Sequence, residues 1–106
     1  MSGYGTVFRV RLRQEATEAQ LRAHLERWQR DLGPRFPGSL TDLLLKVDGE
    51  ERDYLVVHLF ASREAYAAMD GDAPQDAWYR SLVELLEAEP TFTDVNLVWS
   101  AVPGAV

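Results

Sequence analysis

Cysteine is absent from the 106 residues, and so are long apolar runs, basic clusters and low-complexity stretches. Without thiols the chain has no disulfide framework and no thiolate metal site. No apolar segment approaches the length of a membrane-spanning helix, so a membrane is not an expected partner. The first ten residues lack the charged and then apolar pattern of a secretory leader, and we therefore expect a cytoplasmic protein.

Positive charge is also scarce. The formal net charge is −6 and the pI is about 4.8. Lys46 is the single lysine, and the arginines are spread along the chain rather than clustered. Such a surface repels phosphate backbones, so nucleic acid is not an expected partner. The preference for arginine over lysine, with frequent alanine, favours a GC-rich bacterial source.

The residues that are present are those of an ordinary globular domain, with 46% hydrophobic and 26% charged side chains. The length predicts one domain over residues 1–106, near the size at which association with a second copy helps stability. Alternation at period 2 and apolar spacing at period 3.6 then predict the elements. In order they are a strand over 6–13, a helix over 18–32, strands over 39–47 and 54–60, a short helix over 63–69, a helix over 73–89 and a strand over 92–99.

Residues suited to helix caps and turns support these boundaries. Thr17 and Gln20 have the spacing of a capping box, and Ser62 and Asp72 are suited to cap the two later helices. The turn 48–53 joins the second and third strands into a hairpin. The order of strand, helix, strand, strand, helix, strand predicts an α+β, ferredoxin-like βαββαβ fold with a four-stranded antiparallel sheet.

Alternation also divides each strand into two sets of side chains. The fully apolar sets are expected to pack under the helices: Phe8, Val10, Leu12, Leu43, Leu45, Val47, Leu55, Val57, Leu59, Val95, Leu97 and Trp99. The opposite sets mix charged and apolar residues, among them Arg9, Arg11, Asp42, Leu44, Val56, His58, Phe60 and Asp94. A half-ionic sheet face is expected where two sheets close across a two-fold axis, so we predict a homodimer with a dimeric α+β barrel.

The segment 35–69, with its Pro-Gly turn, hairpin and Phe-x-Ser-x-Glu-Ala junction, resembles the antibiotic biosynthesis monooxygenase family, as does 86–99. The resemblance implies a dimeric α+β barrel and, for the cofactor-free class, oxidation of phenolic or anthrone-type polyketides by molecular oxygen. The haem-degrading branch of these proteins uses an Asn, a Trp and a His, and rough matching puts those places near Val10, Met69 and Tyr79. Because no imidazole remains at the axial position, haem is not an expected cofactor.

The residues and the resemblance together suggest a candidate site. We expect the catalytic groups to be Tyr79, Tyr66 and His58, and the substrate-binding groups to be Met69, Trp78, Trp28, Val10, Arg9 and Arg11. Each also has an ordinary structural explanation. His58 is explained as well by a hydrogen-bonded position inside the dimer, the arginines by pairing with Asp42 or Asp94, and the tryptophans by core packing. His24 is expected to be solvated on a charged helix.

No cofactor and no metal are expected, because the acidic turns lack the alternating ligands and closing Glu of a calcium loop and no other ligand cluster is visible. The leading hypothesis is a cofactor-independent monooxygenase, or a closely related cyclase, acting on an aromatic polyketide-like substrate in secondary metabolism. The alternative is a non-catalytic dimeric binding module for a small hydrophobic molecule or a protein partner. The sequence leaves the choice between enzyme and binding module open.

Overall fold

A computed structural model describes residues 3–101. The elements in order are β1 (Tyr4–Arg11), α1 (Glu18–Arg27), a π-helical turn (Trp28–Leu32), a 3-10 turn (Gly33–Arg35), β2 (Ser39–Lys46), β3 (Asp53–Phe60), α2 (Arg63–Ala67), α3 (Ala73–Val83) and β4 (Phe92–Asn96). The strands form one antiparallel sheet in the order β2-β3-β1-β4. The predicted α+β, ferredoxin-like fold is therefore confirmed. Residues 100–106, which have little local structural preference in the sequence, lie mostly outside the described residues.

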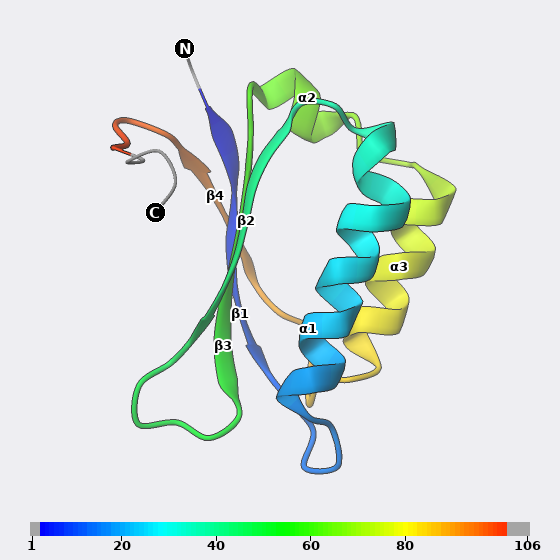
Figure 1. The fold of residues 1–106 in the computed structure, drawn as a ribbon, viewed down its shortest axis with the longest axis vertical. Coiled ribbons are helices and arrows are strands. Elements are labelled where there is room, and N and C mark those ends of the chain that lie inside the picture. Colours follow the sequence, from blue (N-terminus) through cyan, green and yellow to red (C-terminus); the bar gives the residue numbers. More distant parts are fainter. Residues whose placement is uncertain (1–2, 102–106) are drawn as a thin grey trace.

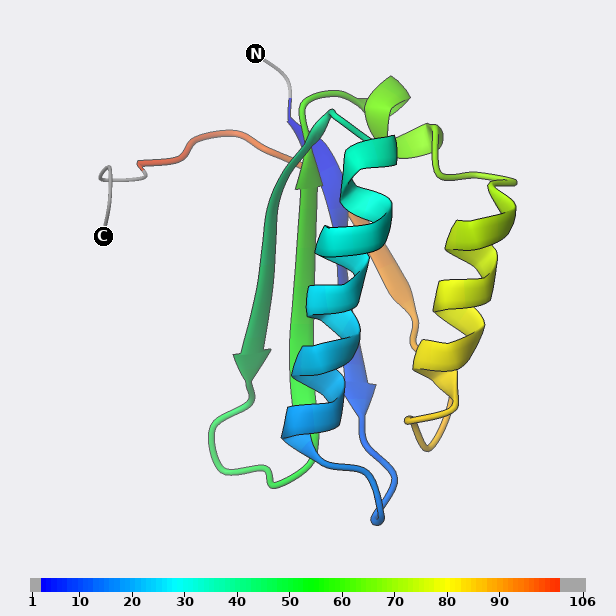
Figure 2. The ribbon, with the colours of Figure 1, turned by 45° about the vertical axis from the view of Figure 1, so that its right-hand side comes forward.

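Both long helices lie on the same face of the sheet. Figures 1 and 2 show α1 and α3 side by side along it, with α2 at the end where β3 finishes. Within residues 3–101, no helix covers the opposite face. The sheet consequently has one covered face, which holds the core, and one open face.

The predicted caps are confirmed. Thr17 and Gln20 form the full capping box at α1, Ser62 accepts from the amide of Ala65 at α2, and Asp72 accepts from the amide of Gln75 at α3. The third helix is shorter than predicted. It ends at Val83 because the following residues turn back to the sheet, where Leu86 forms a bridge with Leu12.

The assignment of the sheet faces is correct for β1 and wrong for the other strands. Phe8 does face the helices, but its neighbours in the ladders are Val56 and Phe92, and Val56 in turn pairs with Leu44. The covered face therefore carries the mixed set, including Asp42 and His58. The open face carries Arg9 and Arg11 with most of the residues that were expected in the core: Leu43, Leu45, Leu55, Val57, Leu59 and Val95.

Two groups of buried side chains fill the space between the sheet and the helices. One group is centred on Phe8, Tyr54 and Leu82 beneath the middle of α1 and α3, and the other on Trp28 and Phe60 near α2. Trp78 packs against both groups. A cavity lies where the two groups meet, and its walls include members of each.

Candidate functional site

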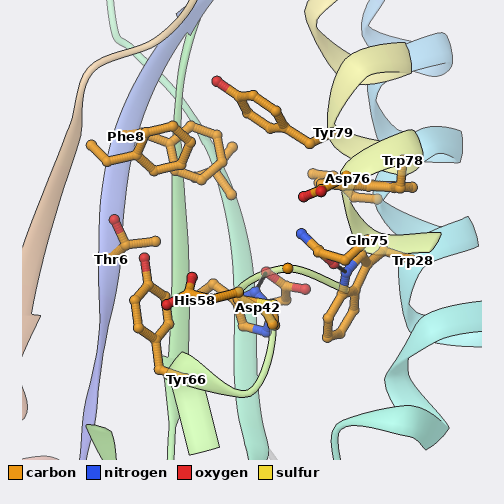
Figure 3. A pocket seen from close by; sticks show the side chains of 16 residues that line it. Thr6, Phe8, Trp28, Asp42, His58, Tyr66, Gln75, Asp76, Trp78 and Tyr79 are labelled. Atoms are coloured by element: carbon orange, nitrogen blue, oxygen red, sulfur yellow. Dashed lines mark hydrogen bonds and ion pairs between the residues drawn. The ribbon is translucent and has the colours of Figure 1, made fainter. Parts of the chain in front are cut away.

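A cavity of about 350 Å³ opens between the covered face of the sheet and α3. The sheet supplies Thr6, Phe8, Asp42, Val56, His58 and Phe92, and the helices with their connections supply Leu25, Trp28, Tyr66, Met69, Asp70, Gln75, Asp76, Trp78 and Tyr79. Figure 3 shows His58 and Asp42 on the sheet side of this space and Trp28 and Gln75 on the helix side. The volume is that of a small-molecule site, which in proteins is typically a few hundred Å³.

An acid and an imidazole lie together at the bottom of the cavity. His58 Nδ1 is 3.8 Å from Asp42 Oδ1, and His58 Nε2 is 2.9 Å from the Ser39 hydroxyl. Gln29 donates to the other oxygen of Asp42 at 2.8 Å. These contacts follow from the β2–β3 ladder, which pairs Asp42 with His58 directly. A titratable pair is thus held at the sheet side of the cavity.

Burial shifts these two groups in opposite directions. It raises the pKa of Asp42 to about 6, against a lowering by the Gln29 hydrogen bond, and it lowers the pKa of His58 to about 4. Desolvation disfavours whichever form is charged, so an acid and a base respond with opposite signs. At neutral pH the site therefore holds a carboxylate beside a neutral imidazole, and Asp42 is the stronger base of the two.

The indole rings are fixed by hydrogen bonds as well as by packing. Trp28 lies edge-on to the His58 ring at 4.6 Å and donates to the side chain of Gln75 at 2.6 Å. The Trp78 ring stacks on the His24 ring, with 4.9 Å between the ring centroids. The Trp78 indole N–H donates to the backbone carbonyl of His24, and His24 Nε2 in turn contacts the backbone carbonyl of Trp78. The expectation that His24 is solvated is wrong, because it is half-buried and links α1 to α3.

The two predicted tyrosines approach the cavity from different elements. Tyr66 on α2 packs edge-on against Tyr4 and Phe60, and its hydroxyl is 3.4 Å from Asp94. Burial and then the Asp94 charge raise the pKa of Tyr66. Tyr79 on α3 lines the opposite side, and burial, with the charge of Glu89, raises its pKa too. Both phenols therefore remain protonated donors at neutral pH.

Three of the predicted site residues lie elsewhere. Val10 is only 2% exposed and belongs to the core beneath the cavity. Arg9 and Arg11 lie on the open face, where both hydrogen-bond to Asp53 at 2.7–3.1 Å. Arg11 first and Arg9 second lower the pKa of Asp53 to about 2. The expected partners of these arginines, Asp42 and Asp94, are on the other side of the sheet.

The cavity unites six of the nine predicted residues: His58, Tyr66, Tyr79, Met69, Trp28 and Trp78. It also contains residues that the sequence analysis did not assign to it. If the covered face had been known, Asp42 could have been identified as a site residue, because it lies in an apolar strand that neighbours the strand of His58. Gln75, Asp70 and Asp76 carried no such signal, since polar residues in turns and at helix starts are ordinarily solvated.

Within residues 3–101, no group of three or more His, Cys, Asp or Glu side chains is arranged to hold a metal ion. None of the helices in that range is long and apolar enough to cross a membrane. The chemical groups that the cavity offers are three carboxylates, a neutral imidazole, an amide, phenols and indoles.

No protein-family model and no curated protein matches the chain. Several solved structures do. One is a candidate antibiotic biosynthesis monooxygenase from Caulobacter crescentus, 21% identical over 92% of each chain, with a TM-score of 0.76. Another is Rv0793 from Mycobacterium tuberculosis, 20% identical over 94% of this chain and 99% of that one, with a TM-score of 0.72.

A third is SnoaB from Streptomyces nogalater, described as a cofactor-independent oxygenase. It is 12% identical over 98% of this chain and 99% of that one, with a TM-score of 0.67. At such identities the likeness concerns the fold, and folds of this kind carry unrelated functions. The resemblance in the sequence is thus confirmed at the level of structure, and the chain has the ferredoxin-like fold of the antibiotic biosynthesis monooxygenases.

Proposed function

We propose that the protein is a cofactor-independent monooxygenase, or a closely related cyclase, acting on an aromatic polyketide-like substrate. The observation that carries this proposal is the aromatic cavity with a buried acid and imidazole at its base. Its volume of about 350 Å³ suits a ligand of two or three fused rings. The structural likeness to SnoaB adds support from an oxygenase that uses no cofactor.

The chemistry requires a base, an apolar space for oxygen and donors for the substrate oxygen. A base removes a proton from the acidic methylene carbon of an anthrone-like ring, and the carbanion gives up its electrons to O₂. A C–O bond forms, and loss of water leaves a ketone. One oxygen atom enters the product, the other leaves as water, and the substrate supplies all the electrons.

Asp42 is the better candidate for the base at neutral pH, because it is ionised there while its raised pKa still favours proton uptake. His58, the base expected from the sequence, lies beside it and can orient the carboxylate. Tyr66 and Tyr79 are the donors available to the developing oxyanion. Met69 packs against the ring system without stacking or donating as a Trp would.

The open face of the sheet supports a homodimer. Leu43 and Leu45 are 46% and 45% exposed there, beside the partly buried Val57 and Leu59. An apolar sheet face of this extent marks an interaction surface. We propose a second copy as the occupant, which would give the dimeric α+β barrel. His58 then takes no part in the interface, since it faces the helices.

Oxygen uptake with anthrones and naphthols, without added flavin or metal, tests the enzymatic proposal. We expect uptake above the uncatalysed rate. Asp42→Asn and Tyr79→Phe should each lower turnover by roughly tenfold to a thousandfold, as expected for loss of one proton-transfer group or positioned donor. Asp48→Asn, an equal change of charge in the exposed β2–β3 turn, serves as the control.

Two further measurements bear on the cofactor. Haem titration should give no sharp Soret band, and elemental analysis no stoichiometric transition metal. If the ring compounds bind but neither excess oxygen uptake nor a ring-closed product is seen, the enzymatic proposal fails and the binding module takes its place. Conversion of the substrate to a ring-closed product without oxygen uptake would identify the cyclase.

A further inference from the structure

The cavity carries negative charge without any compensating cation. Three carboxylates line it: Asp42 at the base, and Asp70 and Asp76 in exposed positions. Among residues 3–101, no Lys or Arg side chain reaches the lining. The arginines of the same region are engaged elsewhere, with Arg35 paired to Asp72 and Arg63 lying over the ring of Tyr4. Any charge complementary to the site must therefore come from the ligand.

The aromatic rings of the cavity also attract cations. Six aromatic side chains line it: Phe8, Trp28, Tyr66, Trp78, Tyr79 and Phe92. The faces of such rings carry negative electrostatic potential and attract ammonium groups within about 6 Å, Trp most strongly. A flat apolar ligand would be accommodated by the same rings through stacking. The rings define the site independently of the carboxylates, which set its charge.

Proton transfer to Asp42 moves one negative charge from that carboxylate to the ring and leaves the total charge of the cavity unchanged. The ring anion then lies near Asp70 and Asp76, and like charges at short range oppose its formation. The arginines that could have offset this charge, Arg9 and Arg11, lie on the open face of the sheet. A positive group carried by the substrate itself would remove the conflict.

We infer that this cavity selects an aromatic ligand bearing a protonated amine, in preference to neutral or carboxylated aromatics. The inference rests on the proposed function only in taking this cavity as the substrate site. The ring system occupies the apolar part against Phe8 and Trp78, and the ammonium lies toward the carboxylates. Protonated aromatic amines are one class of aromatic compounds, and the same selection is expected whether the protein is an enzyme or a binding module.

Three naphthalenes of matched size test the selection by isothermal titration calorimetry: 1-naphthylmethylamine, 1-naphthylmethanol and 1-naphthoate. At pH 7 and low salt we expect the amine to bind roughly tenfold to a hundredfold more tightly than the carboxylate, with the alcohol between them. The difference should shrink at high salt, since the carboxylates at the mouth are exposed and screened.

Substitution of the exposed carboxylates tests whether they cause the preference for the amine. Asp70→Asn combined with Asp76→Asn should weaken binding of the amine by about threefold to tenfold and leave the alcohol unchanged, because only the cation senses the lost charges. Asp48→Asn combined with Glu51→Gln, which removes two charges from the exposed β2–β3 turn, is the control for net charge and should change none of the three affinities. Equal affinities, tighter binding of 1-naphthoate, or no binding of the amine would overturn the inference.

The outcome is separable from that of the monooxygenase proposal, because binding is measured without any reaction. Selection of the amine without oxygen uptake from any ring compound would uphold this inference and refute the oxygenase. Oxygen uptake with neutral anthrones and no preference for the amine would do the reverse.

Discussion

At the scale of single residues, the most informative pair is Asp42 and His58. The same burial that raises the pKa of the acid to about 6 lowers that of the imidazole to about 4. Their 3.8 Å contact is consequently not an ion pair at pH 7, where the imidazole is neutral. Between about pH 4 and 6 both side chains are uncharged, which is the arrangement that a low-dielectric cavity favours.

These shifts have opposite effects on stability as the pH falls. The folded-state pKa of Asp42 lies above its unfolded value of 3.8, so its protonation between pH 6 and 4 stabilises the folded chain. The folded-state pKa of His58 lies below its unfolded value of 6.5, so stability is lost as the pH falls from 6.5 to 4. In the native protein the two contributions partly cancel.

Asp42→Asn should therefore unmask the His58 contribution. We expect the variant to lose on the order of 2 kcal/mol more stability than the native protein between pH 6.5 and 4. His58→Gln should show the opposite trend, with a relative gain as the pH falls. Urea denaturation at half-unit pH intervals measures both. Parallel curves for the native protein and Asp42→Asn would show that the carboxylate titrates as an exposed one.

At the scale of elements, the sequence predicted what depends on neighbouring residues and missed what depends on pairing. The caps at Thr17, Ser62 and Asp72 are local, so each helix start was found. Alternation separates the two sides of a strand, but it does not say which side the helices cover when both are partly apolar. That choice depends on register, and the ladder of Phe8 with Val56 supplies it.

The candidate site was found in part for the same reason. Tyr79 and Met69 were predicted from the resemblance and do line the cavity, whereas Arg9 and Arg11 were grouped with His58 through the reversed faces. Because the covered face was assigned wrongly for β2, β3 and β4, charged residues that lie on opposite faces of the sheet were grouped into one candidate site. Asp42 was placed on the same face as His58, but because that face was expected in the dimer interface it was considered only as a partner for the arginines.

The cap of α2 offers a test of how an element positions the site. This helix has five residues and carries Tyr66 to the cavity, with Met69 just beyond its end. Ser62→Ala removes the side-chain acceptor for the amide of Ala65, a loss of about 1 kcal/mol in the free energy of unfolding. Because so short a helix depends on its cap, we also expect weaker binding of naphthalene ligands.

Thr17→Ala is the matched change at α1. It removes an equivalent acceptor from the amide of Gln20, at a helix start that does not line the cavity. Urea denaturation should show a similar loss of stability for both variants, while calorimetry should show weaker ligand binding for Ser62→Ala alone. Unchanged binding in Ser62→Ala would mean that packing of Tyr66 on Phe60, rather than the cap, positions α2.

At the scale of the whole molecule, the sheet separates two surfaces of different character. α1 and α3 cover one face (Figure 2), and that face holds the cavity. The other face presents leucine and valine side chains together with the Arg9, Arg11 and Asp53 cluster. The two surfaces share strands, but the exposed Leu43 and Leu45 of the open face do not line the cavity. Changes on the open face should for this reason alter association without altering the cavity.

Light scattering at micromolar concentration should give about twice the 12.0 kDa chain mass for the native protein. Leu43→Glu combined with Leu45→Glu places two carboxylates on the open face along the edge strand β2, where burial against a second copy would leave them without partners. We expect this variant to scatter as a single chain while still binding naphthalene ligands. Ala19→Glu, an added carboxylate on the exposed side of α1, should leave the mass doubled. A native protein with the mass of one chain would remove the second copy as the occupant of this face, and loss of ligand binding in the double variant would show that the cavity depends on association.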